Sequence, residues 1–108
     1  MSLMTPIVFI GASLDDLRAF PAGVRNDAGY QLERVQRGLE PHDWKPMPDI
    51  GSGVREIRIR DRSGEFWVLY VATTATAIYF LHAFQKKTRA TPRLVLELAR
   101  SRFRQIDK

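Results

Sequence analysis

The sequence predicts an α+β fold in which a mainly antiparallel sheet packs against an N-terminal helical hairpin and a C-terminal helix, in the order β-α-α-β-β-β-α. Two changes of pattern predict this. Apolar residues recur at helical spacing in the first half, alternate with charged residues from residue 56 onward, and return to helical spacing near the end. A Pro- and Gly-rich stretch at residues 40–53 separates the two halves. The length of 108 residues suits a single domain over residues 1–108.

The first elements are a short strand and a short helix. Ile7–Ile10 is an apolar run that ends before Gly11, which is typical of a buried strand. Ser13 followed by Asp16 has the spacing of a capping box, with two carboxylates in the first turn. We therefore expect Asp15 and Asp16 to be helix caps rather than catalytic acids.

A second helix is expected to begin at Pro21, whose fixed φ suits the first helical position. Gly38 is a natural stop for this helix. Residues 40–53 then predict a loop long enough to grip a partner. The apolar face of the helix consists of Val24, Ala28, Gln31, Leu32, Val35 and Leu39.

Three strands and a helix are predicted after the loop. In the first strand Ile57 and Ile59 form a buried face and Glu56, Arg58 and Arg60 form the other. Turns at 61–65 and 73–76 introduce the strands 66–72 and 78–86. The final helix follows Thr91 and Pro92. Its apolar stripe holds Val95, Leu98, Ala99, Arg102, Phe103 and Ile106, and its mostly basic stripe holds Arg93, Glu97, Arg100 and Arg104.

Composition excludes several kinds of site. The absence of cysteine excludes disulfides and thiol catalysis. His42 and His82 lack the clustered spacing of a zinc site, and no phosphate loop or nucleophile elbow is present, so we expect no metal and no cofactor. The apolar run 67–72 is too short to span a bilayer and no signal peptide precedes it, so a cytoplasmic protein without membrane association is expected.

Positive charge is concentrated in the second half of the chain. Residues 1–49 carry a net charge of −2, whereas residues 50–108 carry +7. This asymmetry favours a polyanionic partner, which could be RNA, DNA or an acidic protein. A well-solvated basic surface is the alternative.

The strand at 78–86 offers candidates for chemistry. Its even positions share one face if the strand is regular, and they are Ile78, Phe80, His82, Phe84 and Lys86. Arg58 and Arg60 can reach that face. A base, an acid and several cations suit cleavage of RNA by its own 2′-hydroxyl, without a metal. The alternative is structural, with His82, Phe84 and Tyr70 in the core and Lys86, Lys87 and Arg89 at a solvated strand end.

Residues 81–88 (LHAFQKKT), 91–92 (TP) and 99–102 (ARSR) resemble the C-terminal signature of the phage-derived HigB-like toxins, which belong to the RelE/ParE superfamily. The similarity runs from about Ile7 to about Ile106. Shorter matches follow in order upstream: residues 20–21 (FP), 29–32 (GYQL), 36–38 (QRG), 44–46 (WKP) and 53–58 (GVREIR).

The resemblance implies a RelE-like toxin of a type II toxin–antitoxin system, an endoribonuclease that cleaves messenger RNA at the ribosome without a metal. It also implies a helix-turn-helix antitoxin, with operator DNA bound only through the antitoxin complex. A gyrase-poisoning ParE-like toxin and a phage-derived binding module without catalytic activity remain alternatives. The expected catalytic residues are Arg58, Tyr70, His82, Lys86 and Lys87, and the expected substrate-binding residues are Arg55, Glu56, Arg60, Trp67, Phe84 and Arg89.

One position departs from the family pattern. Similar sequences commonly carry an arginine directly after the aromatic residue that corresponds to Phe66, where this chain has Trp67. Such an arginine could stabilise phosphate charge. Arg55 or Arg60 could compensate for its loss, or Trp67 could stack on an unpaired base.

Overall fold

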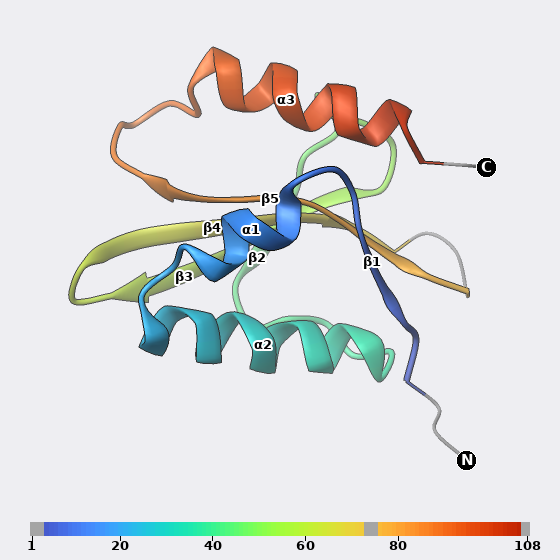
Figure 1. The fold of residues 1–108 in the computed structure, drawn as a ribbon, viewed down its shortest axis with the longest axis horizontal. Helices are drawn as coiled ribbons and strands as arrows, with labels where there is room; N and C mark the ends of the chain where they lie inside the picture. Colours follow the sequence, from blue (N-terminus) through green and yellow to red (C-terminus); the bar gives the residue numbers. More distant parts are fainter. Residues whose placement is uncertain (1–3, 73–75, 107–108) are drawn as a thin grey trace.

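A sheet of five strands separates two helices in the computed structural model, which describes residues 4–72 and 76–106 (Figure 1). The strand order is β1-β5-β4-β3-β2, and among the strands of the described residues β1 pairs in parallel with β5 while the other pairs are antiparallel. The long helix α2 covers one face and α3 covers the other. The predicted α+β class is therefore confirmed. The elements are β1 (Ile7–Phe9), α1 (Ser13–Arg18), α2 (Ala22–Gln36), β2 (Trp44–Pro46), β3 (Val54–Asp61), β4 (Gly64–Val71), β5 (Ile78–Lys86) and α3 (Arg93–Arg104).

The N-terminal elements lie at the edge of the sheet. β1 pairs with the first residues of β5, and Val8 is 41% exposed, so the strand is a half-buried edge and the buried strand predicted here is wrong. The predicted capping box is also wrong. Ser13 lies inside α1, and its buried hydroxyl donates a hydrogen bond of 3.0 Å to the carbonyl oxygen of Phe80. The side chain that was expected to cap α1 thus fastens it to β5.

The second helix agrees with its sequence pattern. It begins after Pro21, and Gly38 adopts a φ of 82°, which ends the helical run. The predicted face is buried from Val24 to Val35, but Leu39 is 51% exposed because the chain leaves the helix before it. α1 contacts β5 whereas α2 contacts β3.

The structure adds a strand within the predicted loop. β2 consists of three residues that pair with Arg55–Ile57 of β3, on the outer edge of the sheet. A segment this short, with a proline at its end, carries no period-two pattern that could have predicted it.

β3, β4 and β5 form the centre of the sheet, and the predicted bounds of β5 are confirmed. β3 and β4 are joined by the predicted tight turn, in which Asp61 pairs with Gly64. The second predicted turn falls mostly on residues 73–75, which lie outside the described residues.

A β-bulge changes the facing of β5 halfway along. Leu69 pairs with His82 but Tyr70 pairs with Phe80, so Leu81 is the extra residue. Ile78 and Phe80 pack in the core beneath α2, whereas Phe84 packs in the core beneath α3. The prediction that the even positions of β5 share a single face is therefore wrong.

Two cores stabilise the fold, one on each side of the sheet. α2 covers the larger one, and α3 covers the smaller one with Ala99, Val95 and Phe103. Leu98, predicted on the apolar stripe of α3, is 38% exposed. In the described part of the chain, no helix is both long and apolar enough to cross a membrane.

Candidate functional site

Three cations gather around the indole ring of Trp67 on the α3 side of the sheet. We call Lys45, Arg58 and Lys86 the cation cluster. The Lys86 Nζ lies 3.7 Å from the ring centroid, the Arg58 Cζ 5.3 Å and the Lys45 Nζ 5.6 Å. The strands explain this convergence, because Trp67 lies directly between Arg58 of β3 and Phe84 of β5.

Trp67 supports the cluster rather than offering an open face to a base. The residue is only 3% exposed, and the cations lie against its ring. The face of an indole ring attracts cations, and burial strengthens this attraction. Stacking of a base on Trp67, considered from the sequence, therefore has no open ring face in this structure.

A buried carboxylate neutralises part of the cluster. Glu56 is fully buried, and its Oε1 accepts a hydrogen bond of 3.1 Å from the Nε of Arg58. Its Oε2 is buried and has no hydrogen-bond partner among the described residues. Burial raises the pKa of Glu56, against the lowering effects of the Arg58 hydrogen bond and of the charges of Lys45 and Lys86. Glu56 was expected beside Arg58 on an exposed face, and its burial corrects that expectation.

His82 belongs to a buried polar group rather than to the cation cluster. Its Nδ1 lies 2.9 Å from the Oδ2 of Asp16, and the Nη1 of Arg102 donates to the same oxygen at 2.7 Å. Only 10% of the His82 side chain is exposed. Burial lowers the pKa of His82, the Asp16 carboxylate opposes this, and the charge of Arg102 adds to it. A carboxylate oxygen can only accept, so His82 donates its Nδ1–H to Asp16.

Sequence reasoning missed two members of this group. Asp16 was expected to cap α1, and its contacts with His82 and Arg102 show that this role is wrong. Arg102 was placed on the apolar stripe of α3 without a function. A charged residue within an apolar stripe was the available signal, since a buried guanidinium requires a partner.

Two predicted site residues lie on the opposite face of the sheet. Tyr70 is fully buried in the core beneath α2, and burial raises the pKa of its hydroxyl against the effect of Arg55. The Arg55 guanidinium lies 4.0 Å from the centroid of Trp44. The structure therefore does not bring Tyr70 and Arg55 to the cation cluster.

The remaining predicted cations lie around the cluster. Arg60 forms an exposed ion pair with Glu65 at 3.4 Å, near the β3–β4 turn. Lys87 and Arg89 are exposed in the segment that follows β5. These three side chains are available to a large ligand that extends beyond the cluster. Among the described residues, no group of three or more His, Asp or Glu side chains could hold a metal ion.

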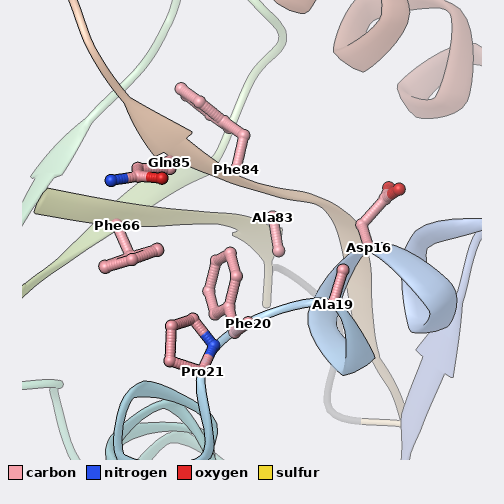
Figure 2. Close-up of a pocket in the computed structure, with 8 residues that line it drawn as sticks. All are labelled: Asp16, Ala19, Phe20, Pro21, Phe66, Ala83, Phe84 and Gln85. Atoms are coloured by element: carbon pink, nitrogen blue, oxygen red, sulfur yellow. The ribbon is translucent and has the colours of Figure 1, made fainter. Parts of the chain in front are cut away.

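A pocket of about 390 Å³ lies beside the end of α1 (Figure 2). The cation cluster does not line this pocket. Phe84 links the two regions, because it lines the pocket and its ring centroid is 5.9 Å from that of Trp67. The lining residues are Asp16, Ala19, Phe20, Pro21, Phe66, Ala83, Phe84 and Gln85.

Comparisons with known proteins agree with this architecture. Residues 15–104 match a family model described as "Phage derived protein Gp49-like (DUF891)". The fold is similar to that of a double arginine-to-alanine mutant of the E. coli toxin RelE in the free state. The TM-score is 0.60 at 18% identity, over 92% of this chain and 97% of that chain. No curated protein matches the chain.

Proposed function

The chain belongs to the family of phage-derived Gp49-like proteins, and from this we propose that it is the toxin of a type II toxin–antitoxin system that cleaves messenger RNA at the ribosome. The cation cluster carries the proposal. It places three positive side chains on one sheet face of a fold similar to that of a toxin. RNA is a polyanion, and its cleavage develops negative charge that such side chains stabilise.

The proposed reaction uses the 2′-hydroxyl of the RNA as the nucleophile. Its proton is removed as the 2′-oxygen bonds to phosphorus. The bond from phosphorus to the 5′-oxygen of the next nucleotide then breaks, and this oxygen takes a proton. Negative charge on the phosphate oxygens grows during the attack, and preorganised cations lower its energy. Because these cations are protein side chains, the proposal requires no metal and no cofactor.

We assign the chemistry to Lys86 and Arg58. The Arg58 side chain is 31% exposed, and the hydrogen bond that its Nε donates to Glu56 fixes its direction, so it is suited to bind phosphate. Lys86 is partly exposed and lies closest to the ring of Trp67, so we assign charge stabilisation and proton transfer to it. His82 is engaged with Asp16 and therefore has a structural role.

The residues around the cluster have supporting roles in this proposal. Three exposed cations would contact phosphates along the RNA strand, namely Arg60, Lys87 and Arg89. Action on ribosomes places the protein in the cytoplasm. The net charge of +7 over residues 50–108 favours an acidic surface on the antitoxin, which we propose carries the helix-turn-helix domain that binds operator DNA.

Expression of the chain with and without the protein encoded beside it tests the proposal. We expect growth arrest, loss of pulse-labelled protein synthesis and cut messenger RNA when the chain is induced alone. Co-expression of the neighbouring protein should restore growth through a complex that a pull-down detects. The Lys86→Ala variant is the control for chemistry at the cluster.

Two outcomes would contradict the proposal. Growth arrest with normal protein synthesis and damaged DNA would assign the chain to gyrase-directed toxins. An absence of growth arrest at confirmed expression would favour a binding module without catalysis.

A further inference from the structure

Arg102 contacts the residue at which β5 changes its facing. Its Nη1 donates a hydrogen bond of 2.8 Å to the carbonyl oxygen of Leu81, the extra residue of the bulge. The same nitrogen donates to Asp16, and the Nε of Arg102 lies so close to Gly11 that an added Cβ there would be 3.3 Å away. The guanidinium is therefore held at the bulge by hydrogen bonds to α1 and β5, in a side chain that is only 9% exposed.

The bulge determines which residues of β5 face the cation cluster. Because side chains of a strand alternate, one extra residue moves every later side chain to the other face. Before the bulge, the even residues Ile78 and Phe80 face α2. After it, Phe84 lies opposite Trp67, and Lys86 lies over the ring of Trp67. A regular β5 would place Lys86 on the opposite face.

A row of ring contacts continues from the bulge to the cluster. The rings of His82 and Phe84 are stacked, with centroids 5.3 Å apart and an interplanar angle of 18°. Phe84 contacts Trp67 at 5.9 Å, and Trp67 contacts Lys86 at 3.7 Å. Asp16 orients this row at its start, because it accepts from both His82 and Arg102.

We propose that Asp16 and Arg102 are positioning residues for the cation cluster, because they hold the β5 bulge and the His82 ring that set Phe84 and Trp67 beneath Lys86. The inference rests on the proposed function only where it assigns Lys86 to RNA cleavage. The placement of Trp67 can be measured without any activity, so the two ideas can fail separately.

The test uses Trp67 as a reporter. In a Trp44→Phe background Trp67 is the only remaining tryptophan, so its fluorescence and near-ultraviolet circular dichroism report its packing. We expect Arg102→Met to change both signals well below its melting temperature and to lower RNA cleavage per folded molecule about 10²-fold, as small misplacements of reacting groups do. Asp16→Asn should act in the same direction. This milder change is the second variant if Arg102→Met does not fold.

Arg100→Met is the matched control on the same helix. Arg100 donates to the carbonyl oxygen of Asp49 at 2.9 Å and does not hold the bulge. It should lower stability without changing the Trp67 signals. If Arg102→Met and Asp16→Asn lower only the melting temperature, with Trp67 signals and cleavage equal to those of Arg100→Met, both residues merely dock α3 and the proposal is wrong.

A double-mutant cycle tests whether Asp16 affects the packing of Trp67 through the ring of His82. His82→Phe retains a ring beside Phe84 but loses the hydrogen bond to Asp16. If Asp16 acts through His82, Asp16→Asn changes the Trp67 signals less in the His82→Phe background than in the parent. Equal effects of Asp16→Asn on the Trp67 signals in both backgrounds would show that His82 does not link Asp16 to Trp67. When the parent chain cleaves no RNA, the proposed function fails, and the Trp67 signals still decide this inference.

Discussion

Lys86 and Arg58 share one aromatic ring but are held differently. Arg58 has a second anchor in the buried carboxylate of Glu56, whereas Lys86 rests at the end of β5 against Trp67. A partly exposed lysine at a strand end contributes little to folding stability, so its removal separates function from stability.

We expect Lys86→Ala to lower RNA cleavage by about 10²–10³-fold, the usual cost of one preorganised charge donor. Its melting temperature should equal that of the parent. Cleavage assays beside thermal melting measure both quantities. Lys87→Ala is the neighbouring control and should reduce cleavage less, because Lys87 is exposed beyond the strand. A fully active Lys86→Ala protein would show that the assigned site is wrong.

Glu56→Gln should also lower RNA cleavage, but unlike Lys86→Ala it should raise the stability of the protein at pH 7. Burial raises the pKa of Glu56 above 4.5. Between pH 4.5 and this raised pKa, the folded protein therefore holds a proton that the unfolded chain lacks. The contribution of Glu56 to stability is therefore lost as the pH rises through this window. The Gln variant should melt higher than the parent at pH 7 and lose this pH dependence, while cleavage falls because Arg58 loses its charged partner. Melting curves from pH 4.5 to 7.5 decide this, and a lower melting temperature of Glu56→Gln at pH 7 would contradict it.

Two residues of the cluster, Arg58 and Lys86, could be anticipated from the sequence, whereas Lys45 was missed. The alternation of charges along β3 and the family resemblance pointed to Arg58, and the basic strand end pointed to Lys86. The contacts of Asp16 with His82 and Arg102 span 66 and 86 positions in the sequence. Local spacing carries no signal for such contacts, so the capping pattern of Asp16 suggested the wrong role.

The sequence predicted where β5 begins and ends, but not which side of the sheet each of its side chains faces. Residues before and after the bulge are buried on both sides of the sheet, for example Phe80, Leu81 and Ala83. A strand with two buried faces shows no clear alternation, so an inserted residue leaves no mark in the hydrophobic pattern. The bulge is therefore a tertiary feature, supported by α3.

The group that joins α1, β5 and α3 should make stability depend on pH. Burial lowers the pKa of His82 below 6.5, so the unfolded chain binds a proton in the window in which the folded protein does not. The contribution of His82 to stability is thus complete above pH 6.5 and is lost as the pH falls through the lowered value. Glu56 titrates in the opposite direction over the same range, so the measurement is made in a Glu56→Gln background. Denaturant titrations between pH 5 and 7.5 should show this loss in that background and with His42→Asn added, but not with His82→Asn added. An unchanged dependence in His82→Asn would assign it to another group.

α3 packs tightly on the loop before β3. A Cβ added at Gly51 would lie 2.5 Å from the ring of Phe103, so Gly51→Ala must displace the ring or the loop. Overpacking of this kind costs about 1–3 kcal/mol of unfolding free energy. Gly23→Ala in α2 is the control, since nothing lies within 4 Å of its added Cβ and helical alanine should stabilise by about 0.5–1 kcal/mol. Urea denaturation measures both, and equal stabilities of Gly51→Ala and the parent would show that Phe103 moves without cost.

Across the whole molecule, the two faces of the sheet are used differently. α2 closes one face over the larger core, and that face holds Tyr70 and Arg55 away from the cluster. α3 covers only part of the other face, which leaves Arg58 and Lys86 partly exposed beside it. Since residues 50–108 carry a net charge of +7, long-range attraction of RNA adds to the local effect of the cluster.

This arrangement predicts a measurable dependence of RNA binding on salt. Each phosphate neutralised on a single strand contributes about −0.7 to the slope of log K against log salt concentration. Contacts from Lys45, Arg58 and Lys86 therefore predict a slope of about −2 or steeper, and roughly a 20-fold loss of affinity between 50 and 200 mM salt. Fluorescence anisotropy with a labelled single-stranded RNA measures this slope.

Removal of one member of the cluster should make that slope shallower by a defined amount. Lys86→Ala is expected to reduce its magnitude by about 0.7, because one phosphate contact is lost. Arg93→Ala is the control of equal charge change, since Arg93 is an exposed residue of α3 that pairs with Glu97 at 2.9 Å. A change of net charge alone would shift both variants equally. A contact at the cluster shifts only Lys86→Ala, and equal slopes for the two variants would show that RNA binds elsewhere on the molecule.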